Sequence, residues 1–167
     1  MKEVAFPAGP HDHRACMAET LEAAERLAAA RDEKLTPLRR RVLEILLESH
    51  RPLGAYDILG GLARDGAKPA PPTVYRALDF LTAQGFVHRI DSLNAFAACF
   101  APDRAHRSHF FLCRGCGRAA EIHDAALDEA LTRAAADAAF GAERETVEIS
   151  GLCADCRRSA SVTTPQA

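Results

Sequence analysis

The chain has 167 residues and a mass of 18.0 kDa, which is enough for one ordinary domain or two small ones. Its 48% hydrophobic and 26% charged residues exclude a disordered chain, and its net charge of −2 provides no overall basic field that would demand nucleic acid. No apolar run approaches the ~18 residues of a membrane span, and the first residues lack the apolar stretch of a secretory signal, so we expect a cytoplasmic protein with no membrane partner.

The first two thirds of the chain predict helices followed by a hairpin. Residues 1–14 are expected to form a loose tail, and residues 68–72 a rigid proline-rich connector that cannot be helical. Apolar residues at helical spacing, with a capping Thr36-Pro37 before the second helix, predict helices at about 15–30, 37–49, 56–64 and 73–84. Strands at 86–90 and 95–100 flank a turn at 91–94. This order is typical of a winged helix-turn-helix DNA-binding domain, which we place at residues 15–100.

The last third predicts a second, smaller unit. A hinge at residues 101–107 leads to an α/β unit over residues 108–158, and residues 159–167 are expected to be disordered. Its predicted elements are strands at 109–113, 118–122 and 145–150 and a helix at 124–140. One helix covering three strands makes a thin core, so the unit would need a covalent or metal staple and a partner.

Two Cys-x-x-Cys pairs, Cys113/Cys116 and Cys153/Cys156, predict a structural zinc site. Two residues between cysteines let both thiolates face one tetrahedral ion at ~2.3 Å, and Gly117 permits the tight knuckle. A redox pair would begin a helix in a thioredoxin-like unit, whereas both pairs here follow predicted strands. The expected fold is therefore α+β, an N-terminal winged helix-turn-helix domain followed by a small α/β dimerisation domain with a zinc knuckle.

A second group of metal-ligand residues surrounds the predicted hairpin. If the turn centres between Leu93 and Asn94, His88 lies directly opposite Cys99, where one ion could bridge the two side chains. His106 in the hinge and Glu121 in the smaller unit would complete a tetrahedral set. The alternative is that Cys99 is a small buried apolar residue and the other three are unrelated surface groups.

The helix predicted at 73–84 leaves polar residues on its outer face. An arginine early in such a helix, here Arg76, can reach a guanine edge, while Thr73 and Tyr75 suit phosphates or a thymine methyl group. The alternative is an ordinary amphipathic helix. The run Arg39 to Arg41 lies in the only net-basic third of the chain, but such a run is more often a solvated helix face.

Several segments together resemble the ferric uptake regulator family of metal-dependent bacterial repressors. They are KLTPLRRRVLEILL, AYDIL, PPTVYRALDFLTAQGFVHRI, CRGCG and CADC, and the resemblance covers about residues 15–157. Within the family the chain is most similar to the zinc uptake regulator branch. That resemblance implies a regulatory zinc on His88, Cys99, His106 and Glu121, and DNA contacts from Tyr56, Thr73, Tyr75 and Arg76.

The resemblance implies a zinc-responsive repressor of zinc-uptake genes, not an enzyme. We expect a homodimer with two zinc ions per chain, one structural and one regulatory, bound to an AT-rich inverted repeat of double-stranded operator DNA and taking no small-molecule substrate. The alternative is an iron-, manganese- or peroxide-sensing repressor of the same family. The segment AHRSHFF lacks the full histidine cluster of the iron sensors, and a Cys99 thiolate favours zinc. His11 and His13 are expected to be uncoordinated.

Overall fold

The computed structural model describes residues 13–67, 69–103 and 107–162, which form two compact units. Of the described residues, 13–67 and 69–103 belong to one unit and 107–162 to the other. We call them the N-terminal unit and the C-terminal unit. Among the described residues, no helix combines the length and the apolar character needed to cross a bilayer.

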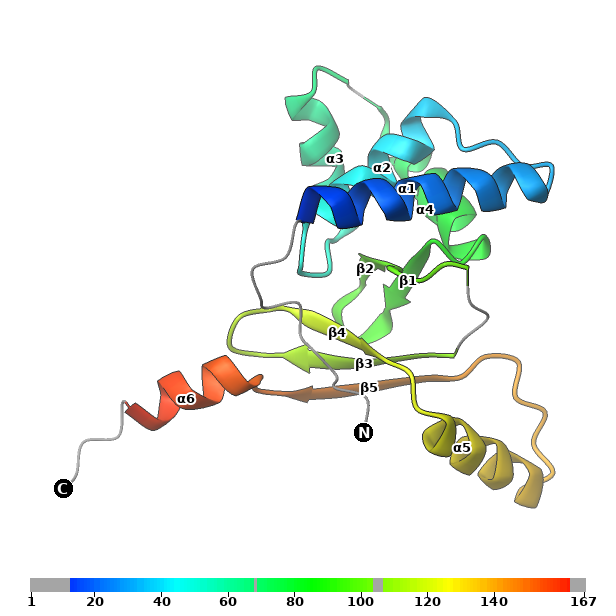
Figure 1. Cartoon of the computed structure of the whole chain (residues 1–167), viewed down its shortest axis with the longest axis vertical. Helices are drawn as coiled ribbons and strands as arrows, with labels where there is room; N and C mark the ends of the chain where they lie inside the picture. Colours follow the sequence, from blue (N-terminus) through cyan, green and yellow to red (C-terminus); the bar gives the residue numbers. More distant parts are fainter. Residues whose placement is uncertain (1–12, 68, 104–106, 163–167) are drawn as a thin grey trace. The chain divides into compact units, whose positions relative to one another are not determined.

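Four helices build the N-terminal unit, as the sequence predicted. They are α1 (His13–Ala30), α2 (Pro37–Glu48), α3 (Ala55–Arg64) and α4 (Pro71–Ala83), coloured blue to green in Figure 1. α2 packs against the other three helices. The core is apolar and close-packed, and its fully buried side chains include Leu43, Leu47, Ile58, Leu78 and Leu81. Burial of these side chains stabilises the unit because each removes apolar surface from water.

The starts of two helices differ from the prediction. Thr36 caps α2 as expected, since its Oγ1 accepts a hydrogen bond from Arg39 N at 3.4 Å. However, α4 begins at Pro71 rather than Thr73, so the expectation that the whole proline-rich connector is non-helical is wrong for its last two residues. The prolines occupy the first turn of α4, where a missing N–H breaks no intrahelical hydrogen bond. α1 likewise begins at His13, two residues earlier than predicted.

The wing is a hairpin of β1 (Val87–Ile90) and β2 (Ala95–Ala98), and its register corrects our prediction. His88 pairs with Ala97, not with Cys99. The difference arises in the loop. A 3₁₀ turn (Asp91–Leu93) and Asn94, which has φ +46°, form a four-residue connection, so that Ile90 pairs with Ala95. The register thus slips by two residues from the predicted one. Because side chains alternate with a period of two, such a slip keeps both ligand candidates on one face.

The C-terminal unit contains a three-stranded sheet in the order β4-β3-β5 (Figure 1). β3 (Ser108–Cys113) pairs antiparallel with β4 (Ala119–Ile122) and parallel with β5 (Thr146–Gly151). α5 (Ala125–Asp137) follows β4 and α6 (Ala154–Val162) follows β5. α6 was not predicted, and its backbone is helical through Val162, where we expected disorder from residue 159.

α5 does not bury a face against the sheet, contrary to our expectation of a covering helix. None of its residues is buried, and its apolar stripe of Leu127, Leu131 and Ala135 is only half-buried. A polar link holds α5 to the sheet instead. Val147 N donates to Nδ1 of the buried His109 at 3.2 Å, so Nε2 of that ring carries the proton that Asp128 Oδ1 accepts at 2.8 Å. Apolar surface of this unit therefore stays partly exposed.

Candidate metal centres and DNA-binding surface

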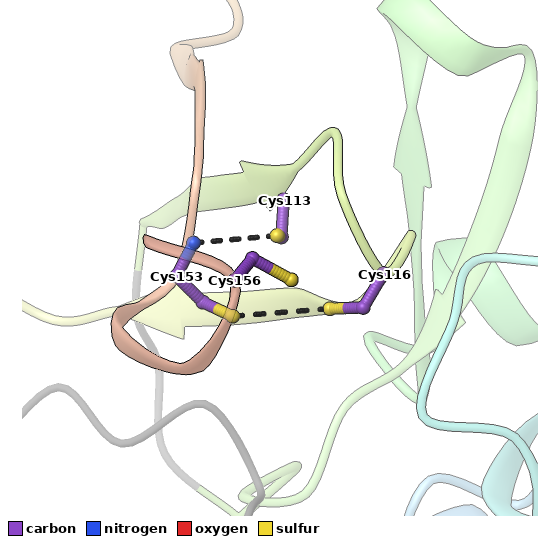
Figure 2. A group of neighbouring side chains, drawn as sticks. All are labelled: Cys113, Cys116, Cys153 and Cys156. Carbon is purple, nitrogen blue, oxygen red and sulfur yellow. Dashed lines mark hydrogen bonds between the residues drawn. The ribbon is translucent and has the colours of Figure 1, made fainter. Parts of the chain in front are cut away.

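The four paired cysteines come together in the C-terminal unit. Cys113 ends β3, Cys116 follows in the next turn, and the second pair lies at the start of α6. Their four sulfur atoms all lie within 4.8 Å of one another, and Cys116 Sγ is 3.9 Å from Cys153 Sγ (Figure 2). All four are free thiols, and Cys113 and Cys153 are buried. The arrangement offers four sulfur donors to a single ion.

Two glycines make the first knuckle possible. Gly117 has φ +73°, and its N–H donates to Cys113 O at 2.8 Å. Gly115 is needed for a different reason, because a Cβ at that position would lie 2.8 Å from Cys156 Sγ. Sequence reasoning identified Gly117 but missed Gly115, since the approach of the second cysteine pair is a tertiary contact.

Hydrogen bonds lower the pKa of two of the four thiols. Cys153 N donates to Cys113 Sγ at 3.3 Å, and backbone hydrogen bonds of this kind lower the pKa of Cys113 to about 6. Arg118 Nε donates to Cys116 Sγ at 3.2 Å and lowers the pKa of Cys116. Arg118 is a supporting residue that sequence reasoning missed, because a lone arginine after a knuckle carries no motif.

The fourth sulfur shows why the cluster suits a cation. Neighbouring sulfurs of Cys153 and Cys113 raise the pKa of Cys156 to about 12, so without a metal this thiol keeps its proton at neutral pH. Four thiolates in one place become favourable only when a divalent ion offsets their mutual repulsion. A tetrahedral set of four sulfurs is the usual structural zinc site and leaves no open position for catalysis.

A second pair of soft donors lies on the wing of the N-terminal unit. Cys99 follows β2, is buried, and its N–H donates to Phe86 O at 3.0 Å. This hydrogen bond extends the β1–β2 pairing by one more residue. His88 pairs with Ala97, and Cys99 is two residues beyond Ala97, so its side chain lies on the same face of the hairpin as that of His88. The ligand atoms of His88 and Cys99 lie within 4.8 Å of each other. The pair is thus diagonal rather than directly opposite, yet still able to share an ion.

The remaining two predicted ligands lie elsewhere in the chain. Glu121 is on β4 of the C-terminal unit, where its backbone pairs with that of Phe110. Its carboxylate is 4.0 Å from Nε2 of His123. His106 lies outside the described residues, so its assignment as a ligand stays a prediction.

The predicted DNA-contacting residues surround the exposed face of α4. Its inner face is buried through Val74, Ala77, Leu78 and Leu81, whereas Tyr75 and Arg76 are exposed and Thr73 is half-buried. Tyr56 on α3 is 74% exposed, and it lines a small apolar hollow together with Tyr75. Within the described part of the chain, Arg76 makes no ion pair or hydrogen bond through its side chain, so its guanidinium is available.

The three consecutive arginines of α2 are engaged within the N-terminal unit. Arg39 lies over the Phe80 ring, 3.4 Å from its centroid, and donates to Lys34 O. Arg40 pairs with Glu25 and Glu44, and Arg41 pairs with Asp65, Glu44 and Glu48. This run therefore forms ion pairs and a ring contact within the unit, whereas the expectation was a DNA-facing patch or, more commonly, a solvated helix face.

Most of the chain is similar to regulators of zinc uptake. The zinc uptake regulation protein of Escherichia coli (strain K12) is 38% identical over 139 residues, which cover 83% of this chain and 81% of the relative. A solved zinc uptake regulator in complex with zinc and DNA matches with a TM-score of 0.83 and 36% identity, over 87% of this chain and 97% of that chain. The crystal structure of holo XcZur matches with a TM-score of 0.77 and 39% identity, over 84% and 98%. Residues 30–150 match the Ferric uptake regulator family, and the chain therefore belongs to that family.

Proposed function

We propose that the protein is a zinc-responsive transcriptional repressor of zinc-uptake genes. The observation that carries the proposal is the pair His88 and Cys99, two soft donors within 4.8 Å of each other on the wing of a winged-helix unit. A thiolate and an imidazole favour zinc over ferrous iron and manganese. The relatives support this choice, because those with the highest identities reported above are named for zinc uptake regulation.

One zinc ion is structural in this proposal. Cys113, Cys116, Cys153 and Cys156 would hold it, and it would cross-link the end of β3 to the start of α6. Because the C-terminal unit has a thin core, the free energy of zinc binding there is also free energy of folding. Such a site stays filled when free zinc is low and carries no signal.

The second zinc ion is regulatory. We assign it to His88, Cys99, His106 and Glu121, ligands that come from the wing, the predicted hinge and the C-terminal unit. An ion bound by all four would restrict rotation at the hinge and raise the population that is competent to bind DNA. Its electrostatic effect is small, because Zn²⁺ with one newly formed thiolate adds about +1 per chain. Geometry is therefore the main part of the switch.

The protein would act as a homodimer formed through the C-terminal unit. α5 buries no residue, and Phe140, Ile149 and Leu152 are 69%, 47% and 41% exposed. A second copy would cover this apolar surface, because a unit this small rarely leaves such a surface exposed to water. Two copies can then present their α4 helices to successive major grooves, about 34 Å apart.

The α4 surface would read double-stranded operator DNA, an AT-rich inverted repeat. Within the described residues the guanidinium of Arg76 has no partner, so it can contact a guanine edge. Thr73 and Tyr75 suit phosphates or a thymine methyl group. Tyr56 extends the same surface from α3. With four sulfurs closing one metal site and DNA as the ligand of the other unit, the function is regulatory rather than enzymatic. The six free cysteines suit the reducing cytoplasm.

The test is fluorescence anisotropy on an AT-rich inverted repeat from a zinc-importer promoter, at fixed salt and across buffered free-zinc concentrations. We expect binding to switch on with zinc and not with iron or manganese. Cys99→Ser should abolish the zinc response, whereas Cys16→Ser, a change in the same unit at a half-buried cysteine, should preserve it. An intact zinc response in Cys99→Ser, or activation by iron or manganese alone, would refute the zinc-sensing proposal.

The DNA surface is tested separately, in zinc-loaded protein. Arg76→Ala should weaken operator binding by about 5- to 150-fold, since a bidentate base contact contributes ~1–3 kcal/mol of discrimination. Arg26→Ala, at an exposed arginine of α1 in the same unit, is the matched control and should bind normally. Equal affinities for the two variants would exclude α4 from the interface.

A further inference from the structure

Two histidines that belong to neither proposed zinc site meet in the N-terminal unit. His13 begins α1 and His50 follows α2. Their ring centroids are 4.5 Å apart and the ring planes are tilted by 49°. Both rings are half-buried, and both ring nitrogens of His13 and Nδ1 of His50 are shielded from solvent. The sequence suggested no such pair, because His13 was expected in a loose tail.

The fold explains how these side chains come together. α1 starts at His13 and packs against α2, so its first residue reaches the segment between α2 and α3 where His50 lies. Cys16 is one helical turn beyond His13 on the same face of α1 and is half-buried. Cys16 is a neighbour of His13 along α1 and is not a member of the pair.

The geometry of the pair suits a shared ion. Zinc–nitrogen bonds of ~2.0–2.1 Å place two imidazole nitrogens of one tetrahedral site about 3.3 Å apart. Rings with centroids 4.5 Å apart can present nitrogens at that separation. The tilt also matters, because parallel stacked rings direct their lone pairs in parallel, whereas tilted rings can direct them towards one point.

We propose that His13 and His50 form a third metal site, which takes a divalent transition ion such as Zn²⁺ through one nitrogen of each ring. Water would fill the remaining positions. The ion would cross-link the start of α1 to the segment that precedes α3, within the unit that carries the DNA-binding surface. With two protein ligands rather than four, the site would bind more weakly than the other two and would fill last.

The first test uses the full chain with histidine labelled by ¹⁵N and zinc added in steps. Ring-nitrogen resonances of His13 and His50 should shift together, in a later step than the one that moves His88. Simultaneous movement of the two rings identifies a shared ion without any substitution. If neither resonance moves, or if only one of them moves, the proposal is wrong.

The second test counts zinc per chain after dialysis against buffered zinc. His13→Gln and His50→Gln should each lose one equivalent of weakly bound zinc relative to the wild type, while His11→Gln should keep it. Unchanged thermal melting of the two-zinc forms of both variants checks that the loss is local. If His50→Gln keeps the extra equivalent, the metal is held without the second ring and the proposed site does not exist. Neither test depends on operator binding, so each can fail independently of the proposed function.

Discussion

Gly115→Ala should weaken zinc binding at the four-cysteine cluster without changing any ligand. The added Cβ would lie 2.8 Å from Cys156 Sγ, 2.9 Å from Cys156 Cβ and 3.2 Å from Leu152 Cδ2. The first two distances are shorter than carbon and sulfur atoms tolerate, so the knuckle or the start of α6 must move. Overpacking of this kind typically costs ~1–3 kcal/mol. At tenfold per ~1.4 kcal/mol, zinc affinity should fall by about 5- to 150-fold.

The assay is competition with a chelator of known zinc affinity, followed by thermal melting of the zinc-loaded protein. Gly141→Ala is the matched control, because a Cβ at Gly141 would meet no atom within 4 Å. We expect the control to bind zinc as the wild type does. If Gly115→Ala binds zinc within twofold of the control, the second cysteine pair does not approach the first as closely as the structure has it.

Three further predictions concern the same cluster and the core. Arg118→Met removes the hydrogen-bond donor to Cys116 Sγ and should raise the pKa of that thiol, so zinc affinity at pH 7 should fall by about tenfold or more. Unchanged zinc affinity in chelator competition would contradict this prediction. Cys156, with its pKa raised to about 12, is protonated in the metal-free cluster, so zinc binding should release protons and zinc affinity should rise with pH. Below about pH 6 Cys113 also takes up a proton, so zinc affinity should fall more steeply there. Zinc binding that does not depend on pH would be inconsistent with these thiol pKa values. Leu78→Ala, at a fully buried position of α4, should lower the free energy of unfolding by ~2–5 kcal/mol in urea denaturation, whereas a loss below ~1 kcal/mol would mean that the helix is not packed as described.

The sequence by itself determined the features that depend on local pattern. Helical spacing of apolar residues predicted the four helices of the N-terminal unit, and the Thr36-Pro37 cap placed the start of α2 correctly. The spacing within each Cys-x-x-Cys pair likewise predicted that the two thiols of a pair would face one point, as they do in the four-sulfur cluster. These signals are reliable because each one arises from residues that are near neighbours along the chain.

Only the tertiary structure decided how distant segments meet. The geometry of one loop set the wing register, and with it the diagonal rather than direct placement of His88 and Cys99. α5 was expected to cover the sheet, yet its stripe stays half-buried, because a stripe alone does not say whether the same chain or a second copy will cover it. The need for Gly115 and the His13–His50 contact have the same origin. Each depends on a contact between segments far apart in the chain, which no local periodicity records.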